Sequence, residues 1–236
     1  MDQIAPRFPS CTDFGHARGV YLVFKDMKLL IIGATGNTGR EIVELALARQ
    51  HTVTAFVRSP QKIIHTDSKL SVVRGDPFDL PALAKSLAGQ DAVLSTLGLP
   101  PRQALRPSTF MAESTASIVS AMRTAGVCRL CILSAAVLFP GRGLSFAFFK
   151  WLLQHHARDL EALETIVKAS DLEWTIARPP RLVSAPDARY SAERDALPVG
   201  PAATFSATFR GVASFLLDAA EEHKYVRETV GLVRPR

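Results

Sequence analysis

The segment Lys28–Leu47, KLLIIGATGNTGREIVELAL, decides how this chain folds. Leu29–Gly33 is a short apolar run, which predicts a strand buried on both faces of a parallel sheet. A glycine-rich turn follows, and from Thr38 onward apolar residues recur at helical spacing. A strand, a tight glycine turn and a helix start in this order form a device that binds the phosphates of a nucleotide.

Three glycines in this turn have separate predicted roles. We expect Gly33 to permit the sharp exit from the strand, Gly36 to let the backbone approach a phosphate, and Gly39 to let the helix pack close to the sheet. Glycines also punctuate ordinary loops, so the triplet is informative only because a strand precedes it and a helix follows. The residues expected to hold the pyrophosphate are Gly33, Thr35, Gly36, Asn37, Thr38 and Gly39.

The second predicted strand, Thr52–Val57, indicates which cofactor binds. It ends in Arg58, nineteen residues after Gly39. An acidic residue at this place binds a ribose 2′-hydroxyl, whereas an arginine suits a 2′-phosphate. The sequence therefore favours NADP(H) over NAD(H), and Lys62 would add a second positive charge. The alternative is a solvated loop that carries two cations.

Downstream, predicted strands and helices alternate without a repeat or a linker. We expect strands at 70–74, 92–96, 129–133, 173–177 and 229–233, and helices at 81–87, 109–125, 157–169 and 206–220. Such a series of βα units is typical of a doubly wound parallel sheet, so we predict a single α/β domain of the Rossmann type. This domain would span residues 27–236, with a small substrate-side segment near its C-terminus. Residues 1–26 would be a disordered or peripheral N-terminal extension.

Four further motifs follow predicted strands, at the edge of the sheet where ligands bind. They are Gly75-Asp76-Pro77-Phe78-Asp79, Ser95-Thr96-Leu97-Gly98, Ser134-Ala135-Ala136 and Arg178-Pro179-Pro180-Arg181. With the G-x-x-G-x-x-G spacing of Gly33–Gly39, they resemble the atypical short-chain dehydrogenase/reductase families, especially the NmrA-like and biliverdin/flavin reductase-like groups. The resemblance covers roughly residues 27–233.

The resemblance assigns the first two of these motifs to the cofactor. It implies that Asp76, followed by Pro77, meets the adenine. The alternative for this motif is a turn with an aspartate that caps the next helix. It also implies that Thr96, Leu97 and Gly98 line the ribose and the pyrophosphate.

The other two motifs would lie at the reactive end of the cofactor. The resemblance implies that Ser134 and Ala135 lie beside the nicotinamide and the substrate carbonyl. Arg181 could pair with a phosphate or carboxylate of the substrate. The turn expected to cover the nicotinamide carboxamide comprises Arg178, Pro179 and Pro180.

The chain departs from the family at the catalytic acid. A classical member carries Tyr-x-x-x-Lys on the helix after the fifth strand, whereas residues 151–164 contain no tyrosine. Hydride transfer to a conjugated acceptor does not require a proton donor in the protein, because the proton can come from water. One of two histidines at the helix start could donate a proton, although a solvated helix terminus is the alternative. The catalytic candidates are Ser134, as an orienting hydroxyl, with His155, His156 and Arg181.

These observations predict an NADPH-dependent oxidoreductase that passes hydride to a small-molecule acceptor: a flavin, a biliverdin-like compound, a quinone or a similar conjugated molecule. A second class remains open, an NmrA-like protein that binds NADP(H) without turnover and reports redox state to a partner. An apolar pocket above the nicotinamide would favour the enzyme. A blocked nicotinamide face would favour the sensor. A nucleotide-sugar or quinone-modifying enzyme is a third possibility, since the scaffold serves many chemistries.

Composition argues against several other classes. The net charge is +6 and the basic residues are scattered, so nucleic-acid binding is not expected. The apolar run Leu144–Leu153 is shorter than the roughly 18 residues of a membrane span and contains Lys150. Cys128 and Cys131 would face opposite sides of a strand, which argues against a metal site. We expect a cytoplasmic monomer or homodimer without a metal or a membrane partner.

Overall fold

The computed structural model describes residues 26–140, 151–199 and 204–235. Nearly all of the predicted extension, residues 1–25, lies outside this part of the chain. The strands of the main sheet are β1 Lys28–Ile32, β2 Thr52–Val57, β3 Leu70–Arg74, β4 Ala92–Ser95, β5 Arg129–Leu133, β6 Glu173–Arg178, β8 Ser191–Arg194 and β10 Glu228–Val233. The helices are α1 Asn37–Ala48, α2 Leu80–Leu87, α3 Pro101–Ala104, α4 Phe110–Ala125, α6 Gln154–Lys168 and α7 Phe209–Glu221.

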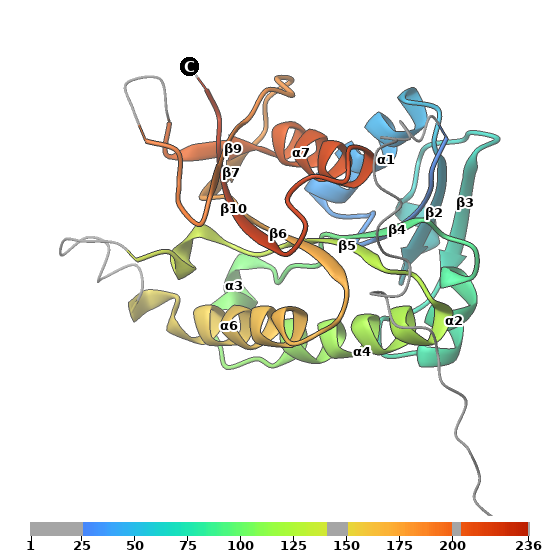
Figure 1. Ribbon diagram of the computed structural model, residues 1–236, viewed down its shortest axis with the longest axis horizontal. Helices are drawn as coiled ribbons and strands as arrows, with labels where there is room; N and C mark the ends of the chain where they lie inside the picture. The colour runs from blue at the N-terminus through green and yellow to red at the C-terminus, as the bar shows by residue number, and fades with distance from the viewer. Residues whose placement is uncertain (1–25, 141–150, 200–203, 236) are drawn as a thin grey trace, which may run out of the picture.

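The main sheet has the strand order β3-β2-β1-β4-β5-β6-β10-β8 (Figure 1). Neighbouring strands are parallel throughout, except that β8 pairs antiparallel with β10 at the edge. The chain builds the sheet outward from β1 in one direction and from β4 in the other. The predicted single α/β domain with a doubly wound sheet is confirmed, and the border between β1 and β4 is its topological switch point.

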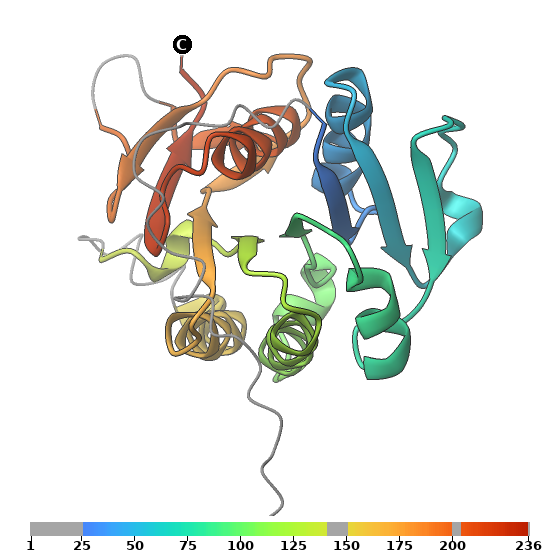
Figure 2. The same cartoon turned by 45° about the vertical axis from the view of Figure 1, so that its right-hand side comes forward.

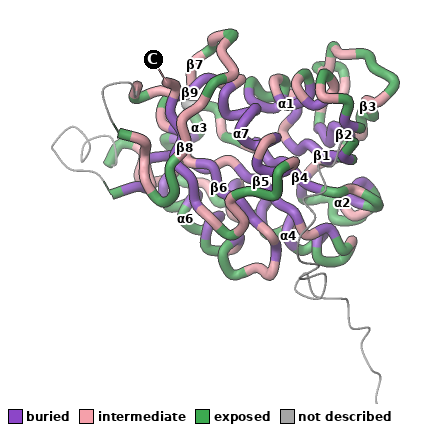
Figure 3. Tube along the Cα trace, turned by 45° about the horizontal axis from the view of Figure 1, so that its top comes forward, coloured by how far each residue is buried: buried purple, intermediate pink, exposed green. Residues whose placement is uncertain are grey.

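Helices cover both faces of the sheet, as Figure 2 shows. Leu29 and Ile31 of β1 point to the face covered by α1 and α7, whereas Leu30 and Ile32 point to the face covered by α2, α4 and α6. Because both faces are buried, the central strands read as continuous apolar runs rather than as an alternating pattern. Figure 3 shows these strands as the buried centre of the molecule.

The structure differs from the prediction mainly in its short elements. The segment 206–220, predicted as one helix, begins as β9 Ser206–Thr208, which pairs with β7 Arg181–Val183 in a second, two-stranded sheet. The turn-rich segment 186–200 contains β8, and α6 begins at Gln154 rather than at residue 157. Strands β7, β8 and β9 have three or four residues each and contain no apolar run. They form here because a partner distant in sequence offers its backbone.

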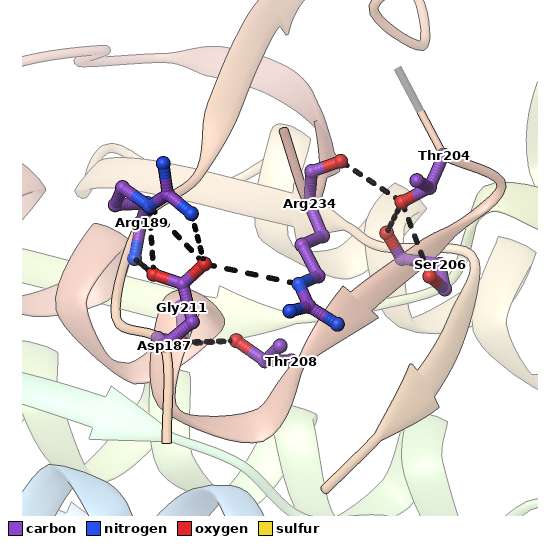
Figure 4. Close-up of polar contacts among 7 residues, drawn as sticks. All are labelled: Asp187, Arg189, Thr204, Ser206, Thr208, Gly211 and Arg234. Carbon is purple, nitrogen blue, oxygen red and sulfur yellow. Dashed lines mark hydrogen bonds and ion pairs between the residues drawn. The ribbon is translucent and has the colours of Figure 1, made fainter. Parts of the chain in front are cut away.

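A polar cluster fixes the start of α7 (Figure 4). The Thr208 hydroxyl accepts a hydrogen bond from Gly211 N at 2.8 Å and donates one to the backbone oxygen of Asp187 at 2.7 Å. The Asp187 carboxylate lies 2.9 Å from Nη2 of Arg189 and 3.8 Å from Nε of Arg234. Hydrogen bonds from Arg189 lower the pKa of Asp187 to about 2. Because Thr208 serves as the N-cap, α7 begins at Phe209, three residues after the predicted start.

Candidate functional site

Two cavities lie side by side at the carboxyl ends of the parallel strands. The first measures about 180 Å³ and adjoins the ends of β1, β2, β3 and β4; we call it the Arg58 cavity. The second measures about 190 Å³ and adjoins the ends of β4, β5 and β6; we call it the His156 cavity. Leu97 and Gly98 line both. A long ligand could therefore extend from one cavity into the other across the switch point.

The glycine turn forms one wall of the Arg58 cavity. Gly33, Thr35 and Gly36 line it. Gly33 leaves β1 with φ +89°, and Gly36 N donates to Gly33 O at 2.9 Å. Helix α1 begins directly afterwards, and no side chain of the described residues caps its N-terminus. The first N–H groups of α1 and its positive dipole end thus lie next to the cavity, an arrangement that binds anions.

Among the glycines near the cavity, Gly39 is required by packing within the protein, whereas Gly36 and Gly98 are not. A Cβ atom on Gly39 would lie 2.2 Å from Gly33 O, so this glycine is required by the packing of α1 against the turn that follows β1. A Cβ on Gly36 would meet one atom within 4 Å, Gly33 O at 3.3 Å, and one on Gly98 would meet none. The protein itself therefore leaves room at Gly36 and Gly98. Larger residues at these two positions would fill this space with their side chains; we call the space at Gly36 and Gly98 the glycine cradle.

Two cations line the Arg58 cavity on the side of β2. Arg58 directly follows the strand, Lys62 lies four residues on, and both are exposed. The Arg58 guanidinium lies 6.0 Å from the centroid of the Phe110 ring. The described residues that line this cavity include no aspartate or glutamate. Backbone N–H groups, two cations and the glycine cradle together fit a nicotinamide dinucleotide, whose phosphates carry the complementary charge.

Some residues predicted to bind the cofactor lie outside these linings. Thr96 and Pro77 line the Arg58 cavity, but Asp76 does not. Its Oδ1 accepts a hydrogen bond from Phe78 N at 3.0 Å and so closes a turn. The aspartate that caps the next helix, α2, is Asp79, which accepts a hydrogen bond from Ala82 N at 3.1 Å. Asn37, Thr38 and Gly39 follow the turn within α1 and do not line the cavity.

The His156 cavity is largely apolar. Ser134, Ala135 and the two prolines of the predicted turn, Pro179 and Pro180, line it together with His156. The other lining side chains are aliphatic or thioether groups: Leu97, Leu99, Met111, Leu133, Leu160 and Leu182. Ser134 and His156 therefore supply the polar side-chain atoms of this lining.

A buried ionic cluster lies beneath the His156 cavity, centred on Glu164 of α6. Its carboxylate accepts hydrogen bonds from Ser134 Oγ at 2.8 Å and from Arg178 at 2.8 and 2.6 Å. Lys168 adds a contact of 2.9 Å from the same helix. Burial raises the pKa of Glu164, but the hydrogen bonds from Arg178, Lys168 and Ser134 outweigh it and leave the pKa lowered. The cluster ties α6 to the ends of β5 and β6.

Sequence reasoning did not find Glu164. The signal was present, because Glu164 follows Leu160 and Leu163 and precedes Val167 on the apolar face of the helix. A carboxylate on such a face needs a partner. That partner is the Arg178 side chain, which the sequence placed near the cofactor only through its backbone. Arg178 also stacks on Phe139, with 4.7 Å from its guanidinium carbon to the ring centroid.

The structure separates the two candidate histidines. Both lie in the first turn of α6, but His156 lines the cavity and His155 does not. The Nδ1 atom of His156 is buried and has no hydrogen-bond partner among the described residues. Burial lowers the pKa of His156, and the nearby Asp159 carboxylate opposes the shift only in part. Arg181 is exposed, starts β7 and does not line the cavity, so the geometry does not bring it to a ligand there.

No helix in the described part of the chain has both the length and the apolar character needed to cross a bilayer. Residues 26–140, 151–199 and 204–235 contain no group of three or more His, Cys, Asp and Glu side chains placed to hold a metal ion. Cys131 is a buried free thiol of β5.

Comparison with known proteins adds three findings. A family model described as NAD(P)H-binding matches residues 33–223. The chain is 28% identical over 216 residues to the uncharacterized protein YwnB of Bacillus subtilis, covering 86% of this chain and 98% of YwnB. It is 33% identical over 179 residues to the oxidoreductase stcQ of Emericella nidulans, covering 65% of this chain and 64% of stcQ.

Solved structures share the fold. A short-chain dehydrogenase/reductase of Veillonella parvula, determined in complex with NADP, superposes with a TM-score of 0.69 at 19% identity. The match covers 89% of this chain and 95% of that one. At this level of identity the likeness concerns the arrangement of strands and helices alone.

Proposed function

This chain belongs to the NAD(P)H-binding family, and on that premise we propose that it is an NADP(H)-dependent reductase that transfers hydride to a conjugated small-molecule acceptor. One observation carries the proposal. The cation-lined Arg58 cavity continues through Leu97 and Gly98 into the apolar His156 cavity. A dinucleotide with its phosphorylated end in the first would bring its nicotinamide to the second.

We assign the following roles to the residues of the two cavities. The glycine turn and the start of α1 bind the pyrophosphate, and Arg58 with Lys62 binds the 2′-phosphate. Gly98 permits close backbone contact midway, and Ser134 with the turn at Pro179 orients the nicotinamide. The aliphatic side chains of the His156 cavity exclude water from an acceptor stacked there. When bound, a reduced nicotinamide supplies the hydride.

Arg58→Ala is expected to weaken NADPH binding by at least about tenfold and to leave NADH binding nearly unchanged. A charge-assisted hydrogen bond to the 2′-phosphate contributes about 1.5–3 kcal/mol, and NADH lacks this group. Isothermal titration with both cofactors measures the difference. Arg123→Ala, which removes the same charge from the far end of α4, should change neither affinity. Equal losses for both cofactors in Arg58→Ala would contradict this assignment.

Ser134→Ala is expected to slow acceptor reduction by about tenfold or less. The change removes one neutral hydrogen bond to the ligand, worth roughly 1 kcal/mol, while Glu164 keeps Arg178 and Lys168. Steady-state oxidation of NADPH with an acceptor checks this. A loss above about a thousandfold would instead indicate that this hydroxyl takes part directly in the chemistry.

The proposed function itself is tested by acceptor-dependent turnover. NADPH oxidation, followed by its absorbance, is measured with riboflavin, FMN, biliverdin, quinones and enones. A reductase oxidises NADPH faster with at least one of them than without any. Tight NADPH binding with no acceptor-dependent turnover would instead support the second function, a redox sensor that binds NADP(H) without reaction.

A further inference from the structure

Arg58 contacts an aromatic ring rather than an acidic group. Its guanidinium carbon lies 6.0 Å from the centroid of the Phe110 ring, and no hydrogen bond or ion pair joins its side chain to another residue of the described chain. A ring face attracts a cation through its quadrupole, but it carries no lone pair and no net charge. The N–H donors of Arg58 therefore remain available to a ligand in the Arg58 cavity, which this side chain lines.

An aromatic partner suits a cation that has to bind a phosphate. A carboxylate beside Arg58 would hold the guanidinium more firmly, but it would also occupy its donors and repel an incoming phosphate. Without any partner, the exposed side chain would keep its full rotamer freedom and lose it on binding. Phe110 avoids both penalties, because its ring limits the positions of the guanidinium without neutralising the charge.

Phe110 is itself fixed by its surroundings. It is the first residue of α4, and the next two N–H groups of the helix, those of Met111 and Ala112, donate to the Asp159 carboxylate at 3.1 and 2.9 Å. Asp159 comes from α6 and is 3% exposed, so it serves as a buried cap for the start of α4. The ring of Phe78 packs edge to face on Phe110, with the centroids 5.8 Å apart. The ring beside Arg58 thus belongs to a capped and packed helix start.

We propose that Phe110 is a positioning residue for recognition of the 2′-phosphate: its ring holds the Arg58 guanidinium in place, and Arg58 binds the phosphate. This inference rests on the proposed function, in which Arg58 contacts the 2′-phosphate of NADP(H). Phe110 does not line the Arg58 cavity, so its effect on the ligand passes through Arg58. Removing the ring should therefore weaken the contribution of the 2′-phosphate to binding and leave the rest of the nucleotide unaffected.

The test uses two nucleotides that differ only in the 2′-phosphate, adenosine 2′,5′-bisphosphate and adenosine 5′-monophosphate, titrated calorimetrically into the whole chain. The ratio of their dissociation constants measures the preference for the 2′-phosphate. Phe110→Leu keeps an apolar side chain but removes the ring face. We expect it to reduce the preference for the bisphosphate by about twofold to fivefold, the range of an exposed cation–π contact, with the affinity for the monophosphate unchanged.

Further variants separate a positioning role from a merely structural one. Phe110→Tyr retains the ring face and should retain the wild-type preference. Combined with Arg58→Ala, Phe110→Leu should reduce the preference no further than Arg58→Ala alone, because the ring acts through the guanidinium. Phe205→Leu makes the same change at a ring that is 74% exposed and directly precedes β9, and it should alter neither affinity.

The wild-type preference and its change in Phe110→Leu bear on different claims. If the wild type prefers the bisphosphate and Phe110→Leu keeps that preference within about 1.5-fold, Phe110 does not position Arg58, and the proposed function stands. A loss of the same size in the Arg58→Ala background would also overturn the inference, since the ring would then act without Arg58. Equal binding of both nucleotides by the wild type would overturn the inference together with the assignment of NADP(H). The expected loss in a chain without acceptor-dependent turnover would support the role of Phe110 and contradict the reductase.

Discussion

Gly36→Val is expected to abolish NADPH binding while leaving the fold intact. The residue lines the Arg58 cavity directly before α1, and a branched side chain there would occupy the space proposed for the pyrophosphate. Losing two charge-assisted hydrogen bonds of about 1.5–3 kcal/mol each weakens binding by roughly a hundredfold to ten-thousandfold. The backbone can adopt the change, because Gly36 has φ −75° and ψ 168°, which any residue accepts.

Isothermal titration with NADPH and a thermal melt together measure this outcome. The melting temperature should fall by only a few degrees, since the added Cβ meets one atom at 3.3 Å. Gly39→Ala is the informative comparison, because its Cβ would lie 2.2 Å from Gly33 O and should destabilise the fold itself. A Gly36→Val protein that binds NADPH normally would show that the phosphates lie elsewhere.

Glu164→Gln is expected to destabilise the protein by about 3 kcal/mol or more, because it leaves Arg178 as a buried charge without its partner. The side chains of Glu164 and Arg178 are 3% and 12% exposed, so water cannot replace the lost carboxylate. In a domain of this size each kcal/mol lowers the melting temperature by about 2–4 °C. A fall of roughly 6–12 °C is therefore expected.

Thermal melts of three variants check this explanation. Glu161→Gln makes the same change on the exposed side of α6 and should leave the melting temperature almost unchanged. Adding Arg178→Met to Glu164→Gln should recover stability, since it removes the unpaired cation. If Glu164→Gln melts within about 2 °C of the wild type, the cluster does not hold α6 to the sheet as described.

The fold could be predicted from the sequence because its central strands are buried on both faces. Strands β2, β3 and β5 have the bounds that their apolar runs predict. The long helices also follow from periodicity, with errors of one to three residues at their ends. Strands β7, β8 and β9 could not be predicted, because their sequences RLV, SAER and SAT contain no apolar run and their pairing depends on partners elsewhere in the chain.

The candidate site likewise has a part that could be predicted from the sequence and a part that could not. The glycine turn, Arg58 and the motif at Thr96 are continuous in sequence with the strands that present them, so their meeting at one edge of the sheet follows from the topology. His155 and His156 could not be told apart beforehand. Neighbouring residues on a helix point about 100° apart, and the docking of α6 on the sheet decides which one enters the cavity.

By itself, then, the sequence determined the doubly wound architecture, the glycine-rich turn between β1 and α1, and the cation after β2, because each depends on a local pattern of spacing and residue type. Only the tertiary structure decided the chemistry of the second cavity. Ser134, Glu164 and Arg178 come from β5, α6 and β6, and their hydrogen bonds form once those elements pack together. The direction of the Ser134 proton and the unpaired nitrogen of His156 follow from that packing, which no local pattern encodes.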